Sequence, residues 1–261
     1  MKNFTPSERS FTGAKPAGAH DEKSAADAVQ QMFDQIAPRY DLLNHVLSMN
    51  IDRLWWWRTA RQFRHILQKS EARVLDLCCG TGDMALALRR SSSKPTDDGR
   101  HPRHAYFAAD FSHPMLRRGQ KKFCGQQIVA IEADALHLPF ANESFDLVVS
   151  AFGFRNLVNY QAGLREIYRV LKRGGEMGIL DFSEPGGVLG KFYGFYFKRV
   201  LPAVGTMISG VRGPYAYLPA SVEQFPPPEK MQERMREAGF GKVSWTPYSF
   251  GIAGLYKGKK I

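Results

Sequence analysis

The sequence predicts an α/β fold with a doubly wound, mostly parallel, seven-stranded sheet. Short apolar runs recur between helical patterns, which is typical of strands buried on both faces of a parallel sheet. A glycine turn follows the first run, where strand gives way to helix. At the chain's end two strand-like runs without a helix between them predict a hairpin, with an antiparallel strand at or near one edge. The expected strands are 74–77, 105–109, 128–131, 145–151, 177–180, 242–246 and 250–256.

The turn after the first strand contains Gly80 and Gly82, and an open α/β sheet binds its ligand at this edge. The spacing Gly80-x-Gly82-x-x-Ala85 also satisfies a relaxed dinucleotide fingerprint. Asp76, inside the strand, favours another ligand, because a carboxylate repels a pyrophosphate but suits an amino group and a sulfonium. Alternatively, Asp76 hydrogen-bonds the loop amides that follow it. The two roles do not exclude each other.

Acidic residues also end the next two strands at the same edge. Asp110 follows the second strand, where a carboxylate can accept hydrogen bonds from both ribose hydroxyls. Alternatively, Asp110 caps the next helix, a role that Ser112 also fits. After the third strand, Asp134 suits an adenine amino group, and Ala135 leaves room for the ring. These positions predict nucleoside binding.

The segments outside this repeat are expected to surround the sheet. Residues 1–28 mix Lys, Ser, Pro and Gly without an apolar core, which predicts a disordered tail before a folded domain over 29–261. Residues 29–70 are expected to form a helical cap across the carboxyl edge, and residues 184–220 an insertion after the fifth strand. The helices expected outside the insertion are 28–36, 51–68, 161–171 and 228–238, besides those after the glycine turn and after Ser112.

Composition limits the class of protein. With 261 residues and 44% apolar content, the chain can bury a full core. It lacks a run of about 18 uncharged apolar residues, so a membrane-spanning helix is not expected. Its three cysteines, with Cys78 and Cys79 adjacent, fit neither a disulfide framework nor a zinc spacing. We therefore expect a cytoplasmic protein without a bound metal.

The net charge of +11 and the pI of about 9.6 predict an anionic partner, either nucleic acid or a membrane surface. The basic side chains concentrate in two stretches that lack acids and are rich in aromatic residues. One lies between Asp52 and Glu71, and the other between Glu184 and Glu223.

Several motifs together resemble the class I S-adenosylmethionine-dependent methyltransferases, which have a Rossmann-like fold. They are Asp-Leu-Cys-Cys-Gly-Thr-Gly-Asp at 76–83, Asp110, Asp134-Ala135, Phe-Asp-Leu-Val-Val at 145–149 and Arg-Val-Leu-Lys-Arg-Gly-Gly at 169–175. More narrowly, three stretches are similar to signatures of the ubiquinone/menaquinone biosynthesis C-methyltransferases. These are 32–44, Phe-Gly-Phe-Arg-Asn at 152–156 and Leu-Asp-Phe-Ser-Glu-Pro at 180–185, within a similarity from about residue 29 to 257.

This resemblance implies S-adenosylmethionine as cofactor and methylation of a ring carbon on a polyprenylated hydroquinone. The reaction it implies is demethylmenaquinol to menaquinol, or methylation of 2-methoxy-6-polyprenyl-1,4-benzoquinol in ubiquinone biosynthesis, or both. The chain departs from the family at Ala151, where Ser is frequent, and at Arg173, where Pro is frequent. Carried over by position, the implied cofactor contacts are Thr81, Asp110, Asp134 and Ala135.

The chemistry of a hydroquinone suggests roles for four further residues. Its carbon attacks well only when a ring hydroxyl is ionised, and ionising a phenol of pKa near 10 at neutral pH costs roughly 4 kcal/mol. A charge-assisted hydrogen bond contributes about 1.5–3 kcal/mol, so one arginine does not suffice. We expect Arg155 and Asn156 to orient the ring oxygens, and Tyr40 or Asp41 to assist deprotonation. Alternatively, Arg155 pairs with Asp41 only to hold the cap.

A polyprenylated substrate and the basic, aromatic insertion predict reversible contact with the inner face of the membrane, at about 1 kcal/mol per basic side chain. The charge also fits a nucleic-acid methyltransferase, but the fourth strand lacks the Asn/Asp-Pro-Pro-aromatic ending, and no Pro-Cys pair is present. We therefore do not expect a nucleic-acid partner. A non-enzymatic cofactor-binding module and a methyltransferase of a sterol or tocopherol-like phenol remain as alternatives, and homo-oligomer formation is left open.

Overall fold

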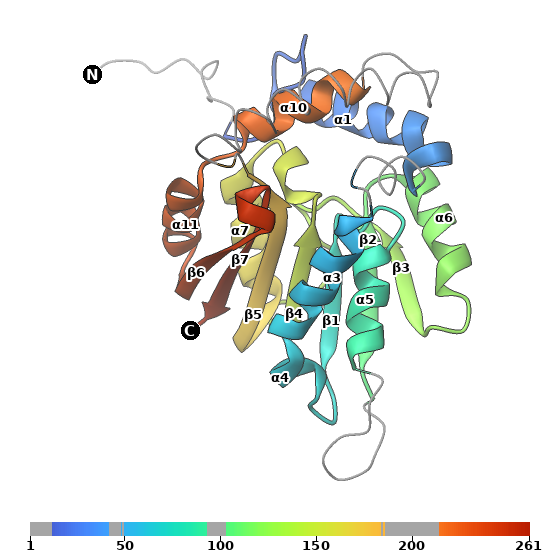
Figure 1. The fold of residues 1–261 in the computed structure, drawn as a ribbon, viewed down its shortest axis with the longest axis vertical. Helices are drawn as coiled ribbons and strands as arrows, with labels where there is room; N and C mark the ends of the chain where they lie inside the picture. The colour runs from blue at the N-terminus through green and yellow to red at the C-terminus, as the bar shows by residue number, and fades with distance from the viewer. Residues whose placement is uncertain (1–11, 42–47, 49, 93–102, 184, 186–213) are drawn as a thin grey trace.

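The computed structural model describes residues 12–41, 48, 50–92, 103–183, 185 and 214–261. They form a seven-stranded sheet in the order β3-β2-β1-β4-β5-β7-β6 (Figure 1). β7 is antiparallel to β5 and β6, and the other neighbouring strands are parallel. The predicted sheet, with an antiparallel strand next to one edge, is confirmed. The strands are β1 Arg73–Leu77, β2 Ala105–Asp110, β3 Ile128–Glu132, β4 Phe145–Ala151, β5 Leu171–Phe182, β6 Phe240–Tyr248 and β7 Ala253–Lys260.

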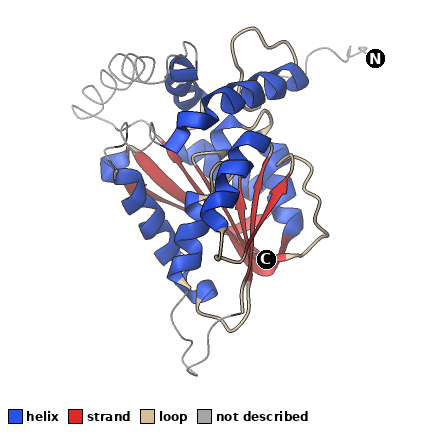
Figure 2. Cartoon of the chain, turned by 90° about the vertical axis from the view of Figure 1, so that its right-hand side faces the viewer, coloured by secondary structure: helices blue, strands red, loops and turns tan. Residues whose placement is uncertain are grey.

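Helices cover both faces of this sheet (Figure 2). Val74 of β1 packs in one apolar cluster with Trp55, Phe63 and Leu88, whereas Leu75 packs in the other with residues of α7 and α11. The strands are thus buried on both faces, as the apolar runs predict. The helical elements are α1 Glu22–Ile36, η1 Ala37–Arg39, α3 Ile51–Gln62, α4 Arg64–Leu67, α5 Asp83–Ser91, α6 His113–Phe123, η2 Phe154–Asn156, α7 Tyr160–Val170, α10 Pro214–Gln224, α11 Pro228–Glu237 and η4 Ser249–Gly251.

The N-terminal region is more ordered than the sequence predicts. Helix α1 starts at Glu22, because Asp21 and Ser24 form a capping box, and Ala25 and Val29 are buried. Ahead of it, the Ala14 N–H donates to the Leu157 carbonyl (2.8 Å). The described residues 12–28 therefore belong to the fold and not to a disordered tail; residues 1–11 lie outside the described residues. The missed signal is an alanine-rich helix start, which has little apolar contrast.

The predicted cap is only partly a cap. Helix α1 lies across the carboxyl edge of the sheet (Figure 1), but α3 and α4, which replace the expected helix 51–68, pack on a face. Trp55 and Phe63 are buried there against β-strand side chains, so the apolar face of this segment is satisfied by the sheet. Of the predicted insertion 184–220, residues 184 and 186–213 lie outside the described residues, and its last part begins α10.

Candidate functional site

A cleft of about 780 Å³, including its open mouth, lies between α1 and the carboxyl ends of the strands. Val29 and Phe33 of α1 line one side, and the tips of β1 to β4 line the other. Six of the predicted site residues line this cleft, namely Tyr40, Gly80, Asp110, Asp134, Ala135 and Asn156. The other five, Asp41, Asp76, Thr81, Gly82 and Arg155, do not line it but bond or pack next to it.

The glycine turn depends on the absence of side chains. Gly82 has φ of +82°, and a Cβ there would lie 2.1 Å from the ring of Phe123. A Cβ on Gly80 would lie 3.6 Å from the ring of Tyr40, so Tyr40 lies directly over the turn. The Ala85 N–H donates to Asp76 Oδ2 (2.8 Å), while Asp76 Oδ1 is buried and has no hydrogen-bond partner in the part of the chain that the structure describes. Burial raises the pKa of Asp76 well above its ordinary value.

Asp110 connects the tip of β2 to this turn. Its carboxylate accepts from the N–H groups of Gly80 (2.8 Å) and Ser112 (2.9 Å). Ser112 is the N-cap of α6, so Asp110 does not cap that helix. Asp110 is only 6% exposed, and burial raises its pKa to about 6. The carboxyl group of Asp110 therefore changes its protonation state around pH 6.

Helix α1 is tied to the residues that follow Asp110. Gln30 Nε2 donates to the carbonyl of Phe111 (2.9 Å). Ser112 Oγ donates to Asp34 Oδ1 (2.5 Å). The helix that covers the cleft and the loop that carries the carboxylate are thus one hydrogen-bonded unit.

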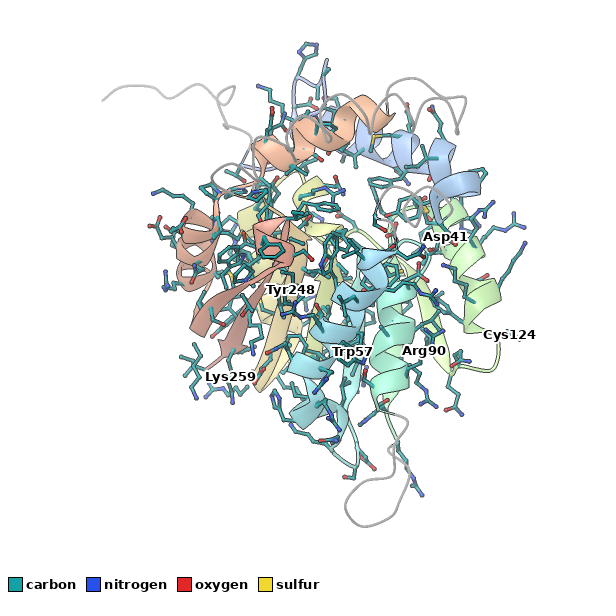
Figure 3. The ribbon with its side chains drawn as sticks, in the orientation of Figure 1. Asp41, Trp57, Arg90, Cys124, Tyr248 and Lys259 are labelled. Carbon is teal, nitrogen blue, oxygen red and sulfur yellow. The ribbon has the colours of Figure 1, made fainter. Side chains whose placement is uncertain are left out.

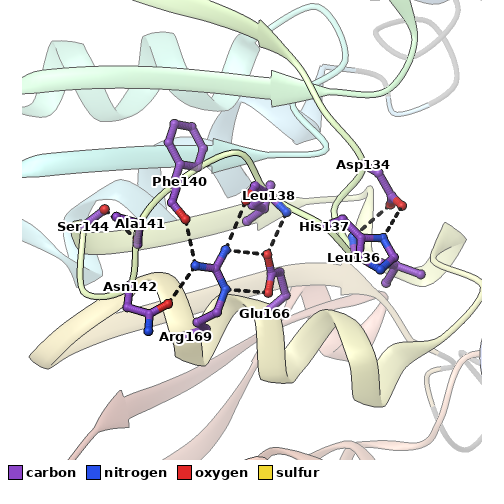
Figure 4. Close-up of polar contacts among 10 residues, drawn as sticks. All are labelled: Asp134, Leu136, His137, Leu138, Phe140, Ala141, Asn142, Ser144, Glu166 and Arg169. Atoms are coloured by element: carbon purple, nitrogen blue, oxygen red, sulfur yellow. Dashed lines mark hydrogen bonds and ion pairs between the residues drawn. The ribbon is translucent and has the colours of Figure 1, made fainter.

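At the third tip, Asp134 is engaged by its own loop (Figure 4). Its Oδ1 accepts from the Leu136 N–H (2.9 Å), and its Oδ2 pairs with His137 Nδ1 (3.0 Å). The carboxylate is more than half exposed, so it can still accept a bond from a ligand. Ala135 beside it is buried.

The loop after this tip is held from α7. Arg169 donates to the carbonyls of Leu138 (3.1 Å) and Phe140 (2.7 Å) and pairs with Glu166 (2.6 Å) (Figure 4). That pairing lowers the pKa of Glu166. The sequence signal for it is the i, i+3 spacing of Glu166 and Arg169, but nothing local indicates which loop they bind.

A polar cluster holds the end of the cap against the glycine turn. Lys122 Nζ lies 2.8 Å from Asp41, 3.0 Å from Asp83 and 2.9 Å from Thr81 Oγ1. Thr81 Oγ1 donates to Asp41 Oδ1 (2.5 Å). The hydroxyl of Thr81 is thus occupied within the protein. Lys122 was not predicted, because its partners are 39 to 81 positions away in the chain.

At the fourth tip, Asn156 lines the cleft and Arg155 does not. The guanidinium of Arg155 is buried, pairs with Asp181 (3.0 Å) at the end of β5 and donates to the carbonyl of Phe152. Its Nε lies 3.3 Å from Ser221 Oγ of α10. The described Arg155 contacts thus involve Asp181 and not Asp41. Asn156 is 8% exposed, lines the cleft, and its Oδ1 has no hydrogen-bond partner among the described residues.

None of the helices in the described part of the chain is long and apolar enough to cross a bilayer.

Comparison with known proteins identifies close relatives. A model described as the ubiE/COQ5 methyltransferase family matches residues 19–260. A demethylmenaquinone methyltransferase of Thermus thermophilus is 45% identical over 88% of this chain and 100% of that protein. One of Deinococcus radiodurans is 42% identical over 92% of this chain and 95% of that protein. A ubiquinone/menaquinone biosynthesis C-methyltransferase, UbiE, of Geotalea daltonii is 40% identical over 90% and 97%.

Solved structures share the fold at lower identity. A SAM-dependent methyltransferase of Thermotoga maritima superposes with a TM-score of 0.60 at 18% identity, covering 89% of this chain and 100% of that chain. The predicted fold class is confirmed by this likeness and by the strand order.

Proposed function

This chain belongs to the ubiE/COQ5 methyltransferase family, and on that basis we propose that it methylates a ring carbon of demethylmenaquinol to give menaquinol. The observation that carries the assignment is 45% identity along the whole of a demethylmenaquinone methyltransferase. The name of the Geotalea relative includes both ubiquinone and menaquinone biosynthesis, so 2-methoxy-6-polyprenyl-1,4-benzoquinol is the second candidate substrate.

The cleft has the polar groups that S-adenosylmethionine needs. Asp110 would accept from the ribose hydroxyls, and Asp134 with Ala135 would hold the adenine. Burial raises the pKa of Asp76, and a cationic ligand above the turn would favour the ionised form of this carboxyl group. Gly80 lets the ligand approach the backbone. When bound, the cofactor supplies an activated methyl group on a sulfonium.

Three other predicted cofactor residues would act by shaping this turn. Thr81 fastens it to Asp41, Gly82 gives it its positive φ, and Oδ2 of Asp76 fixes the start of α5. By fixing the turn they would help to keep the sulfonium methyl group and the attacking ring carbon aligned at about 3–3.5 Å, which is the main requirement of an in-line methyl transfer.

For the quinol, we propose direct contact with Asn156 and Tyr40, because both line the cleft and the Tyr40 ring lies over Gly80. The free Oδ1 of Asn156 can accept a bond from a ring hydroxyl, and the Tyr40 ring covers the turn. Arg155 and Asp41 would serve as positioning residues. Arg155 anchors the carbonyl of Phe152, which has φ of +59°, and so fixes the short helix that carries Asn156.

Deprotonation of the ring hydroxyl needs a proton acceptor, and the Arg155–Asp181 ion pair next to the cleft does not supply one, because the guanidinium already holds that carboxylate (3.0 Å). Asp41 can take up the proton only through water, since Lys122 and Thr81 hold its oxygens. This division predicts that Asn156→Ala lowers kcat, by about 10- to 100-fold, while cofactor affinity stays within about twofold.

The test is turnover of purified protein with S-adenosylmethionine and chemically reduced demethylmenaquinone, followed by mass spectrometry of the quinone. A product one methyl heavier is expected. Asn156→Ala is compared with wild type for kcat and, by calorimetry, for cofactor binding. If the naphthoquinol is not methylated but the benzoquinol is, the second candidate substrate is correct. If neither gains a methyl group although the cofactor binds, the proposed function is wrong.

We also propose that the protein works in the cytoplasm at the inner face of the membrane. Its net charge of +11 and the polyprenyl chain of the proposed substrate support this location.

A further inference from the structure

A second hollow, which we call the α3–α5 groove, lies outside the cleft on the side of the molecule that faces the viewer in Figure 3. Figure 3 shows Trp57 on α3 and Arg90 on α5 at this place. The groove measures about 1480 Å³, including its wide mouth. It is lined by Arg53, Trp56, Trp57, Arg61, Arg64, Asp83, Ala87, Arg90 and Ser91.

The groove is strongly cationic. Four guanidinium groups line it against one carboxylate, Asp83, which already pairs with Lys122 (3.0 Å). Within the described residues, no carboxylate pairs with Arg53, Arg61 or Arg64, and all three are exposed. Like charges gathered in one concavity repel each other, and a bound anion relieves that repulsion. The groove is therefore complementary to an anionic group such as phosphate.

Apolar side chains distinguish a lipid from a soluble anion. Leu54 and Trp57 are each 49% exposed on α3, between the arginines. Arg61 lies over the ring of Trp57, with its Cζ 4.6 Å from the ring centre. Half-exposed tryptophan and leucine among arginines are typical of surfaces that enter the headgroup layer of a membrane. A soluble phosphate or a duplex backbone offers Leu54 nothing to bury against.

The groove is linked to residues that bond next to the cleft. Asp83 belongs to the groove and, through Lys122, to the cluster that holds Asp41 and Thr81 at the glycine turn. A surface seated on α3 would therefore lie next to the end of the cap that covers the cleft. The proposed binding site of the polyprenylated quinol would then lie close to the membrane in which this quinol dissolves.

We propose that the α3–α5 groove binds the phosphate groups of anionic phospholipids, with Leu54 and Trp57 entering the headgroup layer. The inference rests on the proposed function, because a polyprenylated quinol lies in the bilayer. It names the docking surface as α3 and the ligand as an anionic lipid.

The first test is co-sedimentation of the full-length protein with vesicles of phosphatidylcholine, with or without phosphatidylglycerol. The double variant R61A/R64A is compared with R117A/K121A, which removes the same charge from exposed positions on α6. Each basic side chain at an anionic surface is worth about fivefold in partitioning, so R61A/R64A should bind about 25-fold more weakly. The α6 control should lose less than about threefold, and neutral vesicles should bind little of any variant.

The second test follows tryptophan emission on adding the anionic vesicles. A blue shift is expected for wild type and for Trp245→Phe, and a smaller shift is expected for Trp57→Phe, because Trp56 also lines the groove. Inorganic phosphate at equal ionic strength should neither shift the emission nor release the protein from the vesicles.

Several outcomes would overturn the proposal. They are equal binding to neutral and anionic vesicles, equal losses for the two double variants, and release by inorganic phosphate, which would make the groove a site for soluble phosphate. Binding of duplex RNA that depends on Arg61 and Arg64, without vesicle binding, would make it a nucleic-acid site. Turnover of a short-chain quinol in detergent separates the two proposals, since R61A/R64A should retain it. Wild type failing on every quinol would instead refute the proposed function.

Discussion

Protonation of Asp110 should control cofactor affinity near neutral pH. Its carboxylate is buried, and only its ionised form accepts hydrogen bonds at both oxygens from ligand hydroxyls while it also holds Gly80 and Ser112. With a pKa of about 6, nearly every molecule is ionised at pH 7.5 but only about one in eleven at pH 5. The apparent Kd for S-adenosylmethionine should therefore rise about tenfold over this interval, and Asp110→Asn should bind weakly with a flat pH profile.

The raised pKa of Asp110 also makes the folded protein less stable as the pH rises. Because the folded-state pKa lies above the unfolded value, the folded protein keeps a proton that the unfolded chain has released. Stability therefore falls as pH rises from about 4 to 6 and stays reduced above that range. A shift from 3.8 to about 6 corresponds to about 3 kcal/mol. Relative to Asp110→Asn, the wild-type protein should lose about 2.4 kcal/mol of this between pH 4 and pH 7.5, because the unfolded carboxyl group is already partly ionised at pH 4.

Isothermal titration calorimetry in buffers of different ionisation enthalpy measures the linkage directly. At pH 6, binding of S-adenosylmethionine should release about half a proton in wild type and none in Asp110→Asn. Urea unfolding at several pH values gives the stability difference. A pH-independent Kd in wild type, or the same slope in the variant, would refute the assigned role of Asp110.

Three further predictions concern the packing around the cleft. Gly82→Ala should lose about 3 kcal/mol of unfolding free energy in urea titrations, because alanine there has a positive φ and its Cβ meets the ring of Phe123. Gly125→Ala, at a φ of +73° with open space around it, should lose only about 1–2 kcal/mol, and equal losses would contradict the role of Phe123. Lys122→Ala should weaken cofactor binding about fivefold in calorimetry by releasing Asp41 from the turn, and its neighbour Lys121→Ala should leave the affinity unchanged. Asp181→Ala should cost about 3–5 kcal/mol of unfolding free energy in thermal or urea unfolding, because the buried guanidinium of Arg155 loses its partner. Replacing both residues by apolar ones should cost less than the sum of the single changes, and a fully additive double-mutant cycle would show that the pair is not coupled.

The sheet and its ligand edge could be predicted because their signals are local. Asp76 and Gly80 lie within one short stretch with the first apolar run, and Asp110 directly follows the second run, so the sequence alone indicates that all three lie at this edge. Parallel strands then bring their carboxyl ends to one edge whatever the loops contain. This is why Asp110 at the end of β2, Asp134 after β3 and Asn156 after β4 meet in the same cleft.

Partners of charged residues could not be predicted, because they are chosen by the fold and not by spacing. Arg155 was expected at the substrate or paired with Asp41, but β4 and β5 are adjacent, and that brings Asp181 to its guanidinium. Lys122 reaches Asp41 because α6 and the end of the cap meet at the glycine turn. Helix α3 was expected in the cap, since its three tryptophans do not indicate which side faces the sheet.

The ties from Gln30 and Asp34 to Phe111 and Ser112 have a kinetic consequence. A nucleoside bound at Asp110 would stabilise the position of α1, and the aromatic ring of the quinol has to enter the cleft beneath this helix. We expect a compulsory order, with the sulfonium compound entering first and its demethylated form leaving last. Inhibition by that form should accordingly be competitive toward the methyl donor and noncompetitive toward the quinol.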